Sequence, residues 1–314
     1  MTFGRKAWIQ PRAGRLISVL KHEDELFLRY RFDAEGKPKL RPPKRPITLR
    51  HLLTHTAGFS YEVWDANTVR YVKATGMPST STGKVAALRM PLVFDPGDKW
   101  EYGVNIDWVG RVVEAVSGQT LDAYFRDKIF APLGMKDTGF HVPETKRGRF
   151  ATAYARDPAT GELKVFDNPA AGKWAKPPVF ENGSAGLVST ADDFNAFAQM
   201  LLNGGRLGSE RILSRPSVEL MTADHLTPAQ KQGSELFFGD VKGWGFGLSV
   251  YTGRDDLCSV PGRFGWFGGY GTSWYSDPRE SFTGILLTQR MMESPQPPRV
   301  MADFWTSAYQ AIDD

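Results

Sequence analysis

The sequence predicts an α+β fold in which an antiparallel β-sheet is flanked by helices, with a helical subregion in the middle of the chain. Three observations support this prediction. Apolar residues recur at helical spacing over residues 105–129, β-rich runs separated by turns follow residue 243, and a helical pattern occupies residues 303–312. Helices and strands gathered in separate parts of a chain are typical of this class.

Size and composition indicate an ordinary globular protein. The chain has 314 residues, of which 41% are hydrophobic and 24% charged, enough to bury a sizeable core. No apolar run approaches the roughly 20 residues that span a bilayer, and no secretory signal is visible at the N-terminus. The single cysteine, Cys258, excludes an intrachain disulfide, so we expect a small structural residue in a reducing compartment and a cytoplasmic protein without a membrane span.

Positive charge is concentrated at the start of the chain. Residues 1–50 hold 13 lysines and arginines against 5 acidic residues, whereas the remainder is mildly acidic. A basic arm of this kind can bind polyanions. Because no aromatic residues are interleaved with it and no nucleic-acid-binding motif is present, we predict no nucleic-acid partner.

Several helices are predicted from capping residues and apolar spacing. Thr48 is placed to cap a short helix ending near Leu53, with Gly58 as a left-handed terminator. Thr120 opens a helix that stops at Gly134, and Ser189 opens another that ends near residue 203. The remaining helix covers residues 105–116 and is closed by Gly118.

The other segments are predicted to be strands, turns or loops. Residues 95–98 (Asp-Pro-Gly-Asp) form a turn signal. Strand-like runs cover residues 243–251, 271–275 and 282–288, and a final helix follows over residues 303–312. Residues 140–182 indicate loops and short strands, and residues 1–31 carry no sustained helical or strand period.

The common catalytic templates are absent from the sequence. It has no His-Glu-x-x-His motif, no phosphate-binding Gly-Lys-Ser/Thr loop, no cysteine pair for zinc and no Gly-x-Ser-x-Gly elbow. His51 and His55 share the i,i+4 spacing of metal ligands, but no acidic residue follows suitably. We therefore expect them to form structural hydrogen bonds, and we predict neither a metal nor an organic cofactor.

A Ser-x-x-Lys pair is the remaining catalytic pattern. The lysine lies one helical turn from the serine and can take its proton. Two copies occur, Ser18 with Lys21 and Ser81 with Lys84. With 18 serines and 16 lysines in the chain, chance alone produces about one copy, so the motif by itself carries little information.

Five segments, in order, carry a resemblance to a known family. They are residues 47–59 (ITLRHLLTHTAGF), 93–102 (VFDPGDKWEY), 129–140 (IFAPLGMKDTGF), 186–193 (GLVSTADD) and 266–278 (WFGGYGTSWYSDP). The chain from about residue 32 onward resembles the β-lactamase-like, penicillin-recognising serine hydrolases, and in particular the class C β-lactamase-like carboxylesterases. The resemblance implies their fold and an acyl-enzyme chemistry.

The resemblance also implies roles for individual residues. Tyr102 matches the tyrosine that acts as general base in these enzymes, with its phenolate held by neighbouring cations. The alternative to this catalytic role is a structural one, in which Tyr102 is a core tyrosine that caps the start of a helix. The third position of that motif is Val104 rather than Asn, so we assign no catalytic role to the following Asn105.

Trp266-Phe-Gly268 stands where lactamases carry Lys-Thr-Gly. A tryptophan there weakens recognition of an anionic substrate and favours a neutral ester. The resemblance makes the backbone N–H of Gly269 an oxyanion donor, while Gly268 and Gly269 let the acyl group approach closely. A twisted strand near a bulge is the structural alternative for these two glycines.

The family's Ser-x-x-Lys helix lies well before the segment that matches Ile47, whereas Ser18 lies only 29 residues before it. Two explanations are open. Ser18 and Lys21 are a displaced but working pair, or the family's true N-terminus is missing and residues 1–31 are unrelated sequence. The second explanation divides the chain into an atypical basic segment, 1–31, and an N-terminally incomplete hydrolase domain, 32–314. Ser81 and Lys84 lie out of order and are expected in a loop.

The function predicted from this combination is a serine hydrolase that forms an acyl-enzyme, most simply a carboxylesterase acting on small short-chain esters. Two alternatives stay open. One is β-lactamase or D-alanyl peptidase activity, with a β-lactam-like substrate. The other is a catalytically inactive scaffold that lacks its nucleophile.

Overall fold

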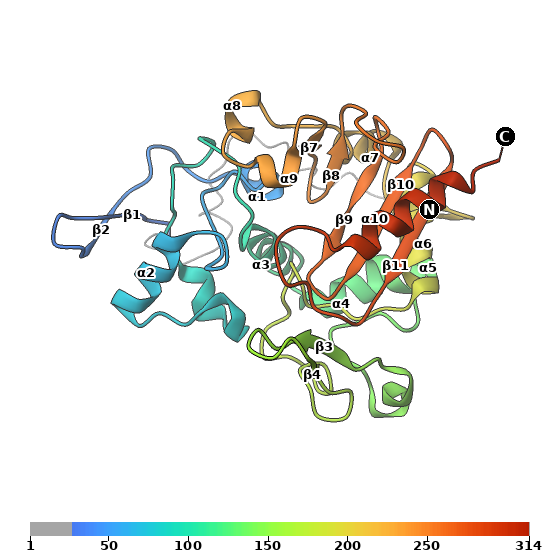
Figure 1. The fold of residues 1–314 in the computed structure, drawn as a ribbon, viewed down its shortest axis with the longest axis horizontal. Helices are drawn as coiled ribbons and strands as arrows, with labels where there is room; N and C mark the ends of the chain where they lie inside the picture. Colours follow the sequence, from blue (N-terminus) through green and yellow to red (C-terminus); the bar gives the residue numbers. More distant parts are fainter. Residues whose placement is uncertain (1–26, 314) are drawn as a thin grey trace.

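A computed structural model describes residues 27–313, and its main sheet has five antiparallel strands in the order β11-β10-β9-β8-β7 (Figure 1). The strands are β7 (Lys242–Trp244), β8 (Ser249–Tyr251), β9 (Phe264–Gly268), β10 (Thr272–Asp277) and β11 (Phe282–Leu287). The runs predicted at 271–275 and 282–288 are confirmed as strands. The run predicted at 243–251 is a hairpin of two strands, because the chain turns between them at Gly247, whose φ is +82°.

A helix covers each face of the sheet. Helix α6 (Ala191–Leu202) packs against Val250, Phe264 and Trp274, whereas α10 (Arg299–Gln310) packs against Tyr251 and Tyr275. Adjacent residues of one strand thus face opposite helices, as the alternation of side chains along a strand requires. The predicted sheet flanked by helices is confirmed.

The middle of the chain is mainly helical, as predicted. Its elements are α1 (Leu49–Leu53), α2 (Ala66–Thr75), η2 (Thr80–Thr82), η3 (Val85–Arg89), α3 (Asn105–Ser117), α4 (Leu121–Phe125), η4 (Arg126–Phe130), α5 (Ala131–Leu133), η5 (Glu144–Arg149), α7 (Arg215–Met221), α8 (Pro228–Lys231) and α9 (Glu235–Phe238). Thr48 and Thr120 cap α1 and α4, and Gly118 ends α3 in the left-handed conformation.

Three local predictions differ from the structure. The residue that caps α6 is Thr190, whose hydroxyl accepts the N–H of Asp193, rather than Ser189. The helix that begins after Thr120 widens into a π turn at η4 before α5. The left-handed residue directly after α1 is His55 (φ +53°), whereas Gly58, which also has a positive φ (+103°), lies three residues further along.

Three two-stranded hairpins complete the fold. They are β1 (Arg29–Phe32) with β2 (Pro38–Arg41), β3 (Ala153–Arg156) with β4 (Leu163–Asp167), and β5 (Arg206–Leu207) with β6 (Glu210–Arg211). The boundary predicted between residues 31 and 32 falls inside β1. Phe27 and Tyr30 are both buried, and Phe27 packs against Phe59 and Trp108, so the chain is part of the core from its first described residue.

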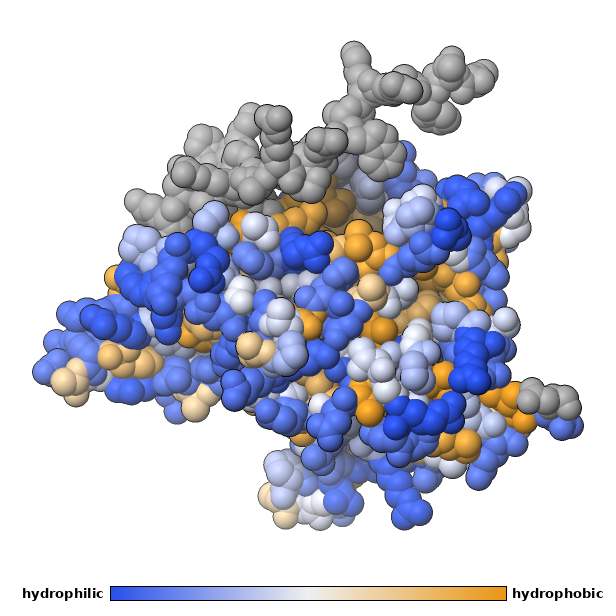
Figure 2. Space-filling model, turned by 90° about the horizontal axis from the view of Figure 1, so that it is seen from above, coloured by the Kyte–Doolittle hydropathy of each residue, from blue (hydrophilic) through white to orange (hydrophobic). Residues whose placement is uncertain are grey.

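Hydrophobic side chains also reach the surface. On the face drawn in Figure 2 they form an area framed by hydrophilic residues. Contiguous apolar areas of this kind are typical of surfaces against which other groups pack.

Within residues 27–313, no helix combines the length and the hydrophobicity that crossing a membrane requires.

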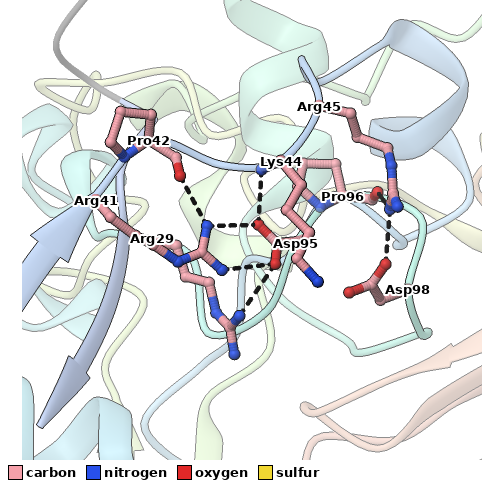
Figure 3. A network of polar contacts seen from close by, with 8 residues as sticks. All are labelled: Arg29, Arg41, Pro42, Lys44, Arg45, Asp95, Pro96 and Asp98. Carbon is pink, nitrogen blue, oxygen red and sulfur yellow. Dashed lines mark hydrogen bonds and ion pairs between the residues drawn. The ribbon is translucent and has the colours of Figure 1, made fainter.

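A buried carboxylate joins the β1–β2 hairpin to the turn at residues 95–98 (Figure 3). Asp95 is fully buried and accepts hydrogen bonds from Arg29 (3.0 Å), from both terminal nitrogens of Arg41 (2.7 and 3.0 Å) and from the backbone N–H of Lys44 (2.9 Å). These cations hold the pKa of Asp95 well below its usual range, the hydrogen bond from Arg41 being the largest cause. Arg29 and Arg41, two of the basic residues counted in the positively charged segment 1–50, therefore form an internal contact.

Asp95→Asn should lower the free energy of unfolding by about 2 kcal/mol at pH 7, because two arginines lose their anionic partner. The pKa of Asp95 is depressed in the folded state, so its contribution is fully present above the unfolded pKa of about 3.9 and declines progressively as the pH falls from there through the lower folded pKa. Denaturant unfolding at pH 7 and pH 3 checks this. A difference between wild type and variant that does not shrink at pH 3 would contradict it.

Candidate active site

Tyr102 lies in the short connection between the turn at residues 95–98 and helix α3. Two hydrogen bonds to His55 fix this connection: Glu101 N–H donates to the His55 carbonyl (2.9 Å), and Gly103 N–H donates to its Nδ1 (3.4 Å). A Cβ on Gly103 would lie 2.5 Å from the carbonyl oxygen of Phe59, so only glycine fits here. The backbone of Tyr102 is therefore held on both sides.

The side chain of His55 packs against the ring of Tyr102. It is 1% exposed and has a left-handed backbone (φ +53°), and its ring stacks on that of Tyr102 with 4.7 Å between centroids. Its Nδ1 also contacts the side-chain amide of Asn105 at 3.0 Å. Burial lowers the pKa of His55 to about 3, so the imidazole is neutral at physiological pH. The structural role expected for this histidine fits these contacts.

Tyr102 lies in a cluster of aromatic side chains, called here the aromatic cluster. Six aromatic rings have centroids 5.6–6.3 Å from its own: Tyr61, Trp64, Trp100, Phe237, Trp244 and Trp266. The residues that carry these rings come from segments far apart in sequence, among them helix α9 and strands β7 and β9. Aromatic rings packed around a polar group exclude water, which strengthens polar interactions at the tyrosine hydroxyl.

Trp266 bonds directly to Tyr102. Its indole Nε1–H donates to the phenolic oxygen at 3.1 Å, which brings together two predicted site residues 164 positions apart. Burial raises the pKa of Tyr102, the hydrogen bond from Trp266 lowers it, and the charge of Asp107 raises it. The resemblance predicts cations beside this phenolate, but in the part of the chain that the structure describes no cation lies over the Tyr102 ring. The net shift is upward because burial outweighs one hydrogen bond.

Gly268 and Gly269 follow Trp266 at the end of β9. The carbonyl of Gly269 accepts the N–H of Met292 (2.8 Å), whereas no residue between 27 and 313 accepts a hydrogen bond from the N–H of Gly269. A Cβ on Gly269 would meet open space, while one on Gly268 would lie 2.6 Å from the hydroxyl of Thr272. Gly269 therefore has an accessible N–H at the strand end, as an oxyanion donor requires.

The predicted pair Ser18 and Lys21 lies outside the described residues. The second pair, Ser81 and Lys84, lies at the surface: Ser81 belongs to η2 and bonds Ser79, and Lys84 precedes η3. Ser81 was expected in a loop but lies in a single 3-10 turn, and neither it nor Lys84 belongs to the aromatic cluster around Tyr102.

Other candidate residues have structural partners. Val104 is buried in the core, and the side-chain amide of Asn105 bonds His55. His51 completes a capping box with Thr48. Cys258 is buried, and burial raises the pKa of its thiol, as expected of a structural cysteine. No group of three or more metal-ligating side chains occurs within the described range.

A family model described as Beta-lactamase matches residues 32–304. The chain belongs to the beta-lactamase family. This result confirms the predicted resemblance, and the match spans all five of the segments that carry it.

The proteins that this chain resembles include one named as an esterase and one named as a synthase. A Mycobacterium tuberculosis protein is 34% identical over 267 residues, covering 82% of this chain and 66% of its own length. Lovastatin esterase of Penicillium rubens is 30% identical over 294 residues, covering 87% and 71%. The solved structure of unliganded simvastatin synthase from Aspergillus terreus superposes with a TM-score of 0.75 at 26% identity, covering 94% and 74%. This chain thus spans about two thirds of the length of the first relative.

The sequence analysis did not identify several residues of the candidate site. The rings of Tyr61, Trp64, Phe237 and Trp244 reach Tyr102 only through tertiary folding. One signal is composition, since nine tryptophans in 314 residues is a high number. The segment 59–64 lies just after a family landmark, so its aromatic residues are the ones that sequence alone could have flagged.

Proposed function

We propose that this protein is a serine hydrolase of the carboxylesterase type, acting through an acyl-enzyme on small neutral esters. The observation that carries the proposal is the hydrogen bond from Trp266 to the hydroxyl of Tyr102 within the aromatic cluster. A penicillin-type substrate carries a carboxylate that a cation must bind. Here an indole occupies that position, which suits an uncharged ester.

The proposed reaction uses a serine nucleophile, for which Ser18 with Lys21 is the candidate pair. The serine hydroxyl gives its proton to the Tyr102–lysine pair and attacks the ester carbonyl, and the N–H of Gly269 stabilises the oxyanion. The alcohol leaves with a proton, and water then releases the acid from the acyl-enzyme. Because burial raises the pKa of Tyr102, a nearby lysine cation is required to bring the phenol into a useful range.

Labelling with a fluorophosphonate probe, followed by intact-mass spectrometry and peptide mapping, tests the nucleophile. We expect one adduct on Ser18 that is lost in Ser18→Ala. Ser81→Ala is the matched control, since it removes the serine of the second Ser-x-x-Lys copy and should label fully. A folded wild-type sample without an adduct would favour the inactive scaffold instead. Faster turnover of nitrocefin than of a short-chain ester would favour the β-lactamase alternative.

A second candidate function is acyl transfer to an alcohol other than water. The aromatic cluster around Tyr102 supports it, because exclusion of water gives an organic alcohol an advantage as acceptor. The names of two relatives, an esterase and a synthase, are consistent with both outcomes of one acyl-enzyme. Adding a primary alcohol to an ester-hydrolysis assay and measuring the new ester against the free acid separates the two.

A further inference from the structure

The turn that carries Gly269 has a single side chain. Residues 268–271 (Gly-Gly-Tyr-Gly) lead from the end of β9 to the start of β10. Glycine has more backbone conformations available than any other residue, so three glycines give the turn little stiffness of its own. Side-chain packing can therefore restrain this turn only through Tyr270.

A hydrogen bond across the turn sets the direction of the Gly269 N–H. The N–H of Gly271 donates to the carbonyl of Gly268 at 3.0 Å. The peptide bond between Gly268 and Gly269 is trans, as are all those within residues 27–313, so its N–H points away from its carbonyl. Because that carbonyl points into the turn, the N–H of Gly269 points out of it, and Gly269 is exposed. The direction of this N–H thus depends on the shape of the turn.

The β3–β4 hairpin is fixed to the same region of the fold. Met292 N–H donates to the Gly269 carbonyl at 2.8 Å. Just before it in the chain, Tyr154 of β3 donates its N–H to the carbonyl of Gln289 (2.8 Å) and accepts the N–H of Met291 (2.7 Å). The hairpin is therefore joined by its backbone to the segment that bonds the turn.

A β-bulge in this hairpin brings Phe166 to Tyr270. Ala153 pairs with Asp167, whereas the next residue of β3 pairs with Val165, so Phe166 is the extra residue of β4 and has no partner on β3. An extra residue of this kind re-aims its side chain. The ring of Phe166 meets that of Tyr270 edge to face, with 5.8 Å between centroids, although Phe166 is 53% exposed.

Trp174 forms a fixed wall for the same ring. It is buried, and its ring meets that of Tyr270 edge to face with 5.2 Å between centroids. The backbone N–H of Lys173 donates to Oδ1 of Asp167 at 2.7 Å, which ties the residue before Trp174 to the residue after Phe166. The two rings that contact Tyr270 are therefore held in place together.

We propose that Phe166 is a positioning residue for the oxyanion donor, acting through Tyr270 to keep the Gly269 N–H in its direction. The inference rests on the proposed function and deepens it, because it assigns the residue that preorganises the donor. A donor stabilises an oxyanion best when it is in place before the charge develops. A looser turn should therefore slow the chemical step while binding of the neutral ester changes little.

The ring of Tyr270 brings no charge to this turn. Burial raises the pKa of Tyr270 to about 12, and the charge of Asp167 adds to the rise, so the phenol is neutral at pH 7–8. A phenolate next to Gly269 would oppose a developing oxyanion by repulsion, and the neutral phenol does not.

The test compares Phe166→Ala with Val165→Ala in the hydrolysis of p-nitrophenyl butyrate. Complete loss of an oxyanion donor costs about 10²- to 10³-fold in kcat, so a donor that is present but less restrained should cost about tenfold, with KM changed by less than about twofold. Val165→Ala is the matched control, since it removes the neighbouring side chain of β4, which is 57% exposed, and should retain the wild-type kcat. Phe166→Tyr, which keeps the ring, should also retain it.

A double variant tests whether Phe166 acts through Tyr270. Tyr270→Ala should lower kcat at least as much as Phe166→Ala, because it removes the only side chain of the turn. Adding Phe166→Ala to Tyr270→Ala should then cause no further loss. Losses that multiply in the double variant would show independent effects and would overturn the inference.

The outcomes separate the two proposals. A wild-type protein that does not turn over the ester would overturn the proposed function and this inference with it. An active wild type, together with a Phe166→Ala protein whose kcat equals that of Val165→Ala, or whose loss lies in KM alone, would overturn this inference only. Circular dichroism spectra and unfolding midpoints identify any misfolded variant. Should Phe166→Ala be one, Tyr270→Ala takes its place, and an unchanged kcat there would overturn the inference equally.

Discussion

Tyr102→Phe should lower kcat for ester hydrolysis by about 10²- to 10⁴-fold, the range for loss of a general base. The ring and its stacking on His55 are retained, so the fold and the KM should change little. Steady-state kinetics on a short-chain ester measure the effect. Tyr124→Phe, in helix α4 and outside the aromatic cluster, is the control and should retain full activity. A Tyr102→Phe protein with wild-type kcat would remove Tyr102 from the mechanism.

The partner change Trp266→Phe tests the hydrogen bond itself. Removing the indole N–H should cost about tenfold in kcat. The bond from Trp266 lowers the pKa of Tyr102, so its loss raises that pKa and the alkaline rise of the pH–rate profile should move to higher pH. A Trp266→Phe enzyme with an unshifted profile would show that the indole acts on packing alone.

Arg263→Ala should lower the free energy of unfolding by about 4 kcal/mol. Arg263 is 1% exposed, and its guanidinium carbon lies over four rings: Tyr251 (5.1 Å), Tyr275 (4.4 Å), Trp305 (4.1 Å) and Tyr309 (5.3 Å). It also donates to the carbonyl of Cys258. The substitution removes these cation–π contacts and leaves a cavity between the sheet and helix α10.

Arg263→Met separates packing from charge. Methionine fills most of the same volume but carries no cation. Neither Nε nor Nη2 of Arg263 has a hydrogen-bond partner within residues 27–313, and this unmet requirement offsets part of the cation–π gain. We therefore expect a loss of about 1–2 kcal/mol for Arg263→Met. Exposed Arg254→Ala should change stability by less than about 0.5 kcal/mol. Denaturant unfolding measures all three, and a loss below about 1 kcal/mol for Arg263→Ala would contradict the prediction.

The family and the local elements could be read from the sequence because their signals are local. Apolar residues at helical spacing predict α3, and Gly118 ends it because a left-handed residue costs glycine little. The threonines before α1 and α4 cap those helices through hydrogen bonds that span three residues. Tyr102 and Trp266 were found through family segments, which tertiary structure then brings together.

Tertiary structure decided the chemistry of the site. The neutral state of His55 and the raised pKa of Tyr102 depend on burial, which no local pattern encodes. The bond between Asp107 and Ser184 joins residues 77 positions apart, and the cage around Arg263 is built from β8, β10 and α10. The sequence by itself determined which helices and strands form and which family they belong to. Long-range packing determined which side chains lie together around Tyr102 and in which protonation state, because burial and hydrogen-bond partners come from neighbours that only the folded chain supplies.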